Sequence, residues 1–556
     1  MNIPLFNNLQ NQFIMEKQNY TTEQRCAALA ALENVLSNPE HRSGAVIRDT
    51  EGLGEENISI LLELGSLREL LDGWYFVCFT KEDGDPTDWY RAYWPFIVAY
   101  LDTLYPGSWC LSPECSLNYY SGYTIIPEEL VIRSKFAEGR IRQLPFDTCI
   151  VEIRGDAPED VVTEERFGVR LFPLHTALLK VPKEYFDKCH VEARTCLAML
   201  TDPEELIRTA GEEYLPERAL RIAKELCKFG RTEMADTIKE AVAEFTKGAE
   251  NIYFPQNDRP LRMTQTGPLG NRIRLMWRQM RTDVLLWKEY EKCKEGSRPA
   301  KEIILRLQET LENERPEIVV LKGLGTDMPE INRDYKGPDE EIPEAAQDLY
   351  RGMGTDLELE HGFRKAFKRV ARDILDSLTG GQRIANLAAY HYADWNYVLF
   401  EPGVKAGLFK APDLSYDRMT WEDPCIVGSR HVPFDPNELE DAVHALSEAF
   451  QREDDPFVRA VLGHFFLIYI QPFTAGNIQT AWLLMNSQLV AAGYPWIVLP
   501  DYYVEEYKTA LREAAELEHV ERLVAVVARL IRASWKTDLR KLAGNTDYLE
   551  NGITGQ

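Results

Sequence analysis

A long apolar run near residue 465 constrains the fold of this chain most strongly. Residues 461–470 read VLGHFFLIYI, which is too short to span a bilayer. With Val458, Val461, Leu462 and Phe465 on one face, residues 455–470 show the spacing of a helix buried in a core. The sequence therefore predicts a helix here with other elements packed around it.

The loop after this helix carries the most specific pattern in the chain. Residues 471–482 read QPFTAGNIQTAW. Pro472 and Phe473 can set and bury a turn, and Gly476 permits the positive φ that such a loop often needs. Asn477 can cap a following helix. The same Gly476 and Asn477 could instead form a residual anion-binding nest, and the residues alone leave both interpretations open.

This loop resembles the signature loop of the Fic (Fido) family, whose pattern is HPFx(D/E)GNGRxxR. Four positions match the pattern: Pro472, Phe473, Gly476 and Asn477. Five depart from it: Gln471 for the histidine, Ala475 for the acid, Ile478 for the second glycine, and Gln479 and Trp482 for the arginines.

The resemblance implies transfer of AMP from ATP with Mg²⁺, and the substitutions argue against it. In the family the histidine is the general base, the acid holds the metal and an arginine grips phosphate. A carboxamide cannot take up a proton at physiological pH, and loss of a base typically costs ~10²–10⁴-fold in rate. Ala475 offers no oxygen to Mg²⁺. We therefore expect no firmly bound cofactor, and ATP and Mg²⁺ only if residual family chemistry survives.

Further landmarks extend the resemblance over residues 265–545. Residues 271–281 have the pattern of an amphipathic helix, 438–450 of another helix and 480–492 of the family's second core helix. A flap hairpin that would line a target groove is expected at Cys425, Ile426, Val427, Gly428, Ser429, Arg430 and His431. Residues 327–360 hold eleven acidic and three basic side chains, so a linker or insertion is expected over 323–360.

The first 84 residues predict a winged-helix-like module. A helix with Cys26, Leu29, Leu32 and Leu36 on one side is followed by short segments and a strand at 74–79. The functional alternatives are DNA binding and protein packing. Residues 41–80 hold three basic and seven acidic side chains, which disfavours contact with phosphates.

Residues 85–250 predict an α+β unit. Strands are expected at 129–133 and 148–154, and a helical half from about 171 to 245. Together with the module before it, the order of winged helix, small sheet and helices resembles the AbiEi-type antitoxin module that precedes some bacterial Fic domains. One basic cluster, Arg133, Lys135, Arg140 and Arg142, fits either a solvated hairpin or a ligand site.

No other residue offers an obvious replacement for the missing base. His464 should point into the core, and His431 could reach the groove or be structural. His361 and His391 lie in helical stretches without an acidic partner at a ligand spacing, and no P-loop, nucleophile elbow or zinc motif is present.

The bulk properties predict a globular cytoplasmic protein. The 556 residues suffice for about three domains, and no secretory signal is evident at the start. A net charge of −26 disfavours general polyanion binding, and the ten scattered cysteines predict reduced thiols rather than a zinc site.

The expected fold is a mainly α Fic-like domain with a flap hairpin, preceded by α+β modules. The leading hypothesis is a pseudoenzyme that binds a protein or peptide partner, in a bacterial toxin–antitoxin or phage-defence setting. The alternatives are a transferase with non-standard catalytic residues and a DNA-binding autoregulator. A homo-oligomer is compatible with the sequence.

Overall fold

The computed structural model describes most of the chain in segments separated by gaps. These segments are residues 20–36, 45–48, 52–78, 86–228, 230–246, 267–286, 298–305, 344–407, 428–432, 434 and 436–536. Of the expected flap residues, Cys425, Ile426 and Val427 lie outside the described residues.

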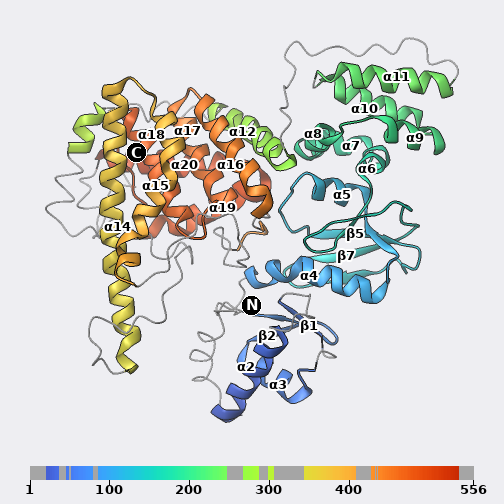
Figure 1. Cartoon of the computed structure of the whole chain (residues 1–556), viewed down its shortest axis with the longest axis horizontal. Helices are drawn as coiled ribbons and strands as arrows, with labels where there is room; N and C mark the ends of the chain where they lie inside the picture. The colour runs from blue at the N-terminus through green and yellow to red at the C-terminus, as the bar shows by residue number, and fades with distance from the viewer. Residues whose placement is uncertain are drawn as a thin grey trace, which may run out of the picture. The chain divides into compact units, whose positions relative to one another are not determined.

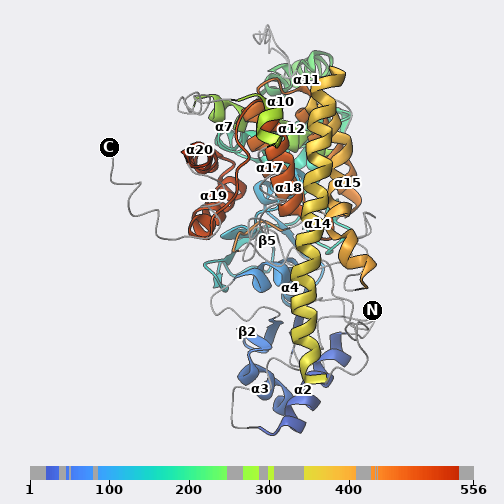
Figure 2. The same ribbon diagram turned by 90° about the vertical axis from the view of Figure 1, so that its left-hand side faces the viewer.

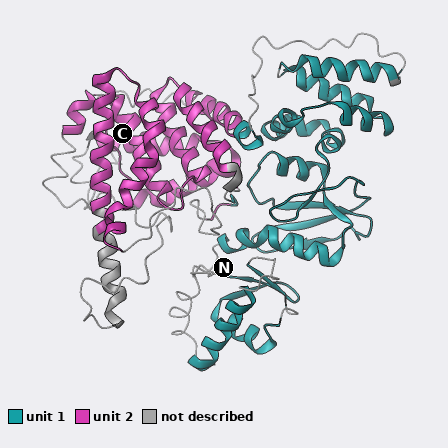
Figure 3. Ribbon diagram, in the orientation of Figure 1, with its two compact units in different colours: residues 1–272, 430–432 teal, residues 273–429, 433–556 magenta. Residues whose placement is uncertain are grey.

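The chain forms two compact units, which Figure 3 distinguishes by colour. Unit 1 contains residues 1–272 together with Arg430–Val432. Unit 2 contains residues 273–429 and 433–556. The expected class is confirmed: unit 2 is helical in its described part, whereas unit 1 combines helices with small sheets.

The first part of unit 1 is a small α+β layer. It contains α2 (Thr22–Leu36), β1 (Val46–Arg48), α3 (Glu55–Leu64), β2 (Leu67–Leu71) and β3 (Trp74–Val77). The strands form an antiparallel sheet in the order β1-β3-β2, and apolar residues of both helices form one buried cluster with it. Helices and a hairpin are therefore present, whereas the winged-helix assignment and a DNA-binding role stay predictions.

The second part of unit 1 is built on a four-stranded sheet in the order β4-β5-β7-β6. Its elements are α4 (Thr87–Leu104), β4 (Trp109–Leu111), α5 (Pro113–Tyr120), β5 (Glu129–Ser134), β6 (Ile141–Gln143) and β7 (Cys149–Arg154). The central strands β5 and β7 are parallel, with Leu130 opposite Ile150. One face of the sheet is covered by α4, whose Trp89 Nε1 donates to Thr148 Oγ1 at 3.1 Å.

Short helices complete unit 1 (Figure 1). After the pair β8 (Val162–Thr163) and β9 (Arg170–Leu171) come α6 (Leu174–Lys180), α7 (Lys183–Lys188), α8 (His190–Met199), α9 (Glu204–Glu212), α10 (Pro216–Lys228) and α11 (Thr232–Thr246). Their apolar faces form a second core with Cys110 and Leu117. The expected helical half is therefore present.

A single helix, α12 (Pro268–Leu286), contains the boundary between the units. Its Arg272, fully buried, forms an ion pair with Glu192 of α8 at 2.8 Å and lies over the ring of Tyr123. A buried charge is tolerated when it is paired in this way.

Unit 2 is a helical bundle around one buried helix. Its main helices are α14 (Glu344–Gly380), α15 (Ile384–Lys405), α16 (Pro436–Arg452), α17 (Pro456–Ile470), α18 (Asn477–Ala491), α19 (Val504–Leu517) and α20 (Glu521–Lys536). In Figures 1 and 2 the long helix α14 runs beside α15. It begins at Glu344, within the stretch where a linker or insertion was expected. Every residue of α17 from Phe457 to Ile470 is buried, which confirms the expected core helix.

Among the described residues no helix is long and apolar enough to cross a membrane.

Candidate functional site

The expected loop connects α17 to α18. The helix α17 starts at Asp455, whose side chain accepts hydrogen bonds from the amides of Phe457 and Val458. It ends at Gln471 in the left-handed conformation, with φ 54° and ψ 63°. The second helix begins after Gly476, whose φ is 77°. The loop is therefore fixed at both ends by residues with positive φ, and only the second is a glycine.

Hydrogen bonds within the loop close it on itself. The Asn477 Oδ1 accepts from the Phe473 amide, and Asn477 Nδ2 donates to the Phe473 carbonyl, both at 2.9 Å. The expectation that Asn477 caps α18 was wrong, because Gly476 occupies the N-cap position and Asn477 is the first helical residue. Its side chain reaches back into the loop instead.

The helix α15 supports the loop from the side. Asn396 Nδ2 donates to the Ala475 carbonyl at 2.9 Å and to Thr480 Oγ1 at 3.0 Å. A Cβ at Gly476 would lie 2.4 Å from Phe400 Cε2, so only glycine fits there. The pattern of residues 471–482 gave no signal for Asn396, which lies on a distant stretch of sequence.

The residue at the position of the family base is enclosed. Gln471 is only 2% exposed, and its Nε2 has no hydrogen-bond partner in the described part of the chain. The same holds for Gln479 Oε1 and Trp482 Nε1. Each unpaired buried polar atom lowers the free energy of unfolding by about 1–3 kcal/mol. The loop therefore keeps polar atoms that can still form hydrogen bonds, and they lower its stability.

The indole of Trp482 is packed as a core side chain. It is 5% exposed, and its ring centroid lies 5.1 Å from that of His464 and 5.5 Å from that of Tyr507. His464 Nε2 is 2.7 Å from the Tyr507 hydroxyl. Burial lowers the pKa of His464 to about 4, so this imidazole is neutral at physiological pH. His464 therefore points into the core, as expected.

The described end of the expected flap pairs with a strand-like segment of unit 1. Residues 430–432 lie antiparallel to 124–126, with His431 opposite Ile125. The Ile126 amide donates to the Arg430 carbonyl at 2.8 Å, and the Val432 amide donates to the Thr124 carbonyl at 3.0 Å. Gly428 and Ser429, which precede this pair, belong to unit 2. His431 is buried within this pair, with 1% of its surface exposed.

Two histidines have acidic neighbours that the sequence did not predict. His391 Nδ1 lies 3.1 Å from Oδ2 of the buried Asp373, which comes from the adjacent helix α14. His361 Nδ1 lies 3.3 Å from Glu358 one turn earlier. Neither histidine was expected to have an acidic partner at a ligand spacing, and this was wrong for His361, because Glu358 lies three residues away on the same helix. Within the described segments no group of three or more His, Cys, Asp or Glu could hold a metal ion.

The basic cluster expected at residues 133–142 is dispersed. Arg142 Nε pairs with the buried Glu152 at 2.6 Å, and Arg140 pairs with Glu138. Lys135 lies over the ring of its neighbour Phe136. Arg133 lines a pocket in unit 1.

Comparison with known proteins places the loop in a family. The model of the Fic/DOC family matches residues 406–489, which include the loop, all of α17 and most of α18. The chain contains a Fic/DOC domain. The Fic-domain positions that diverge from the pattern are thus Gln471, Ala475, Ile478, Gln479 and Trp482.

Relatives of the Fic domain include eukaryotic protein adenylyltransferases. Protein adenylyltransferase Fic from Nematostella vectensis is 40% identical over 84 residues, which are 14% of this chain and 20% of that protein. Protein adenylyltransferase fic-1 from Caenorhabditis elegans is 31% identical over 126 residues, 22% of this chain and 25% of its own length. The matches therefore span about a fifth to a quarter of these relatives.

A solved structure of Fic-1 from C. elegans also matches. It covers 65% of this chain and 96% of its own, with 16% sequence identity and a TM-score of 0.28.

Proposed function

We propose that this Fic domain binds a protein or peptide partner and does not transfer AMP. The observation that carries the proposal is the packing of Trp482 against His464 and Tyr507, at the position where the family pattern has an arginine. A buried indole offers no positive charge to a phosphate. Gln471 supplies no base and Ala475 no metal ligand, so three functions of the family loop are lost together.

The loop nevertheless keeps its shape at some cost. The reciprocal bonds between Asn477 and Phe473 and the two bonds from Asn396 stabilise the connection by about 1 kcal/mol each. The unpaired polar atoms of Gln471, Gln479 and Trp482 work against stability. Such local conflicts are typical of functional sites, which supports a binding role over a purely structural one.

The partner would dock at the flap by strand addition, as the family resemblance implies. The carbonyl of Arg430 and the amide of Val432 are hydrogen-bonded to Ile126 and Thr124, so this segment is already able to pair as a strand. A peptide that uses the same groups must displace residues 124–126. A toxin–antitoxin or phage-defence setting is part of the proposal and rests on the resemblance to AbiEi-type modules.

Two measurements test the two halves of the proposal. Isothermal titration of the full chain with ATP or UTP and Mg²⁺ should show no saturable binding at micromolar concentration, and metal-dependent micromolar binding would refute the loss of nucleotide function.

Selection of extended peptides from a display library should yield binders whose affinity rises in Thr124→Val, because that change weakens the internal strand pair. Peptides that bind wild type and variant equally would place the partner site elsewhere.

A further inference from the structure

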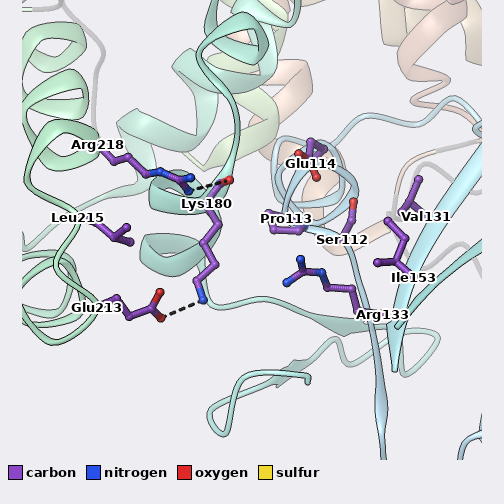
Figure 4. Close-up of a pocket in the computed structure, with 10 residues that line it drawn as sticks. All are labelled: Ser112, Pro113, Glu114, Val131, Arg133, Ile153, Lys180, Glu213, Leu215 and Arg218. Carbon is purple, nitrogen blue, oxygen red and sulfur yellow. Dashed lines mark hydrogen bonds and ion pairs between the residues drawn. The ribbon is translucent and has the colours of Figure 1, made fainter. Parts of the chain in front are cut away.

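A polar pocket in unit 1 is lined by residues that all fall outside the segment 406–489. It has a volume of about 440 Å³, within the usual range of small-molecule sites. Figure 4 shows its walls, which come from the start of α5, the strands β5 and β7, the end of α6 and the beginning of α10. The lining residues are Ser112, Pro113, Glu114, Val131, Arg133, Ile153, Lys180, Glu213, Leu215 and Arg218.

Two of the three cations in the pocket are engaged by the protein. Lys180 Nζ pairs with Glu213 Oε1 at 2.9 Å. One guanidinium nitrogen of Arg218 donates to the carbonyls of Leu179 and Lys180 at 3.1 and 3.2 Å, at the C-terminal end of α6. These contacts hold the α6 wall in place and neutralise the lysine charge.

Arg133 is different from both, because its guanidinium has neither an ion pair nor a hydrogen bond to a described residue. Its guanidinium lies over the ring of Phe172, 5.7 Å from the centroid, and forms no ion pair with any described carboxylate. In Figure 4 the side chain extends from β5 into the space that faces Lys180. Stacking on an aromatic ring orients the fork without using its five donors.

The neighbouring end of α5 adds to this positive field. Ser112 caps the helix by accepting from the Cys115 amide at 3.2 Å, and Pro113 at the first helical position has no N–H. The N-terminal end of a helix carries partial positive charge. Glu114 is the opposing acid. With Lys180 and Glu213 cancelling, Arg133 and Arg218 leave the lining one positive charge in excess over Glu114.

We propose that this pocket binds a small molecule bearing a phosphate or carboxylate group, with the oxyanion on Arg133. An arginine fork matches both oxyanions in a bidentate arrangement. Val131, Ile153 and Leu215 give the rest of the ligand an apolar wall. A positively charged pocket of this kind contrasts with the net charge of −26 of the whole chain.

Glycerol 3-phosphate, glycerate and glycerol form a matched set of probes for the full chain, measured by titration calorimetry at constant ionic strength. Saturable binding of at least one charged probe, about tenfold tighter than glycerol, is the expected result. The preferred probe decides between phosphate and carboxylate. Binding of neither charged probe more tightly than glycerol would overturn the proposal.

Variants then locate the binding. Arg133→Met keeps an apolar stem over Phe172 and should weaken the preferred probe about tenfold or more. Arg154→Met, which removes an exposed charge from the end of β7, should leave it within about twofold. Ile153→Trp, at a residue 42% exposed, should block the pocket without a change of charge or core packing. Unchanged affinity in Arg133→Met or in Ile153→Trp would contradict the assignment.

Discussion

The Nδ1 atom of His431 lies 2.7 Å from the Oγ1 atom of Thr124, although the residues are 307 positions apart in the chain. This contact completes the antiparallel pair between residues 430–432 and 124–126. Val432 also packs against the apolar core of unit 1. Residues 430–432, which lie inside the segment that matches the Fic/DOC model, thus belong to unit 1.

Replacement of Thr124 by Val should loosen this pair. The hydroxyl is lost while the shape is kept, so the buried ring of His431 loses a hydrogen-bond partner at a cost of about 1–3 kcal/mol. The amides of Ile126 and Val432, which donate across the pair, should then exchange with deuterium faster than in wild type. Hydrogen exchange with mass spectrometry of the full chain measures this.

The matched control for that change is Glu128→Gln. Glu128 pairs with Arg430 at 2.9 Å, but the carboxylate side chain is 68% exposed. An exposed ion pair contributes little because water and salt screen it, so exchange at the same two amides should change much less. Equal effects of the two substitutions would show that the His431–Thr124 contact does not stabilise the pair.

Gly476→Ala should destabilise unit 2 through a steric contact. The new Cβ would meet Phe400 and Asn396 at 2.4 and 2.7 Å, in addition to the cost of positive φ. A loss of ~2–4 kcal/mol in the free energy of unfolding is expected from urea denaturation. Gly381→Ala measures the cost of positive φ alone, because φ there is 68° and no atom lies within 4 Å of the new Cβ. Its loss should be only ~1–2 kcal/mol, and equal losses would contradict the close packing of the loop.

Restoring an arginine at position 482 should harm the fold. Trp482→Arg would place a charge among His464 and Tyr507 without an opposite charge, at a cost of about 3–5 kcal/mol. Trp482→Phe keeps an apolar ring there and should cost less, about 1–3 kcal/mol. Urea denaturation compares the two. An arginine variant as stable as the phenylalanine variant would mean that the position still has room for a phosphate-binding group.

Acid should destabilise unit 2 through His464. The folded-state pKa of about 4 lies below the unfolded value of about 6.5, so the unfolded chain binds the proton more readily. Above about pH 6.5 the imidazole is neutral in both states and its titration does not affect the free energy of unfolding. As the pH falls toward 4, only the unfolded chain binds the proton, which lowers the free energy of unfolding by ~3 kcal/mol in full. Thermal unfolding between pH 7 and 5 should shift less in His464→Gln than in wild type. His361→Gln, at an exposed histidine, is the control, and identical pH profiles for wild type and His464→Gln would refute the assignment.

The sequence predicted local elements better than it predicted their partners. The helices α16 and α17 lie within a few residues of the expected 438–450 and 455–470, because each has a clear apolar face. The contact of His431 with Thr124 could not be predicted, since the local sequence pattern around either residue does not indicate a partner so far away in the chain. The support from Asn396 was missed for the same reason. The role expected for Asn477 was wrong because an asparagine at the start of a helix can either cap the helix or bond back to the preceding loop, and the sequence does not distinguish the two.

Incubation of the full chain with radiolabelled ATP and Mg²⁺, with the C. elegans adenylyltransferase as positive control, tests the loss of AMP transfer most directly. With Gln471, Ala475 and Trp482 in the loop, neither the chain itself nor an added lysate should acquire label above a no-enzyme background. Labelling at a rate near that of the C. elegans protein, and abolished by Gln471→Ala, would contradict the account.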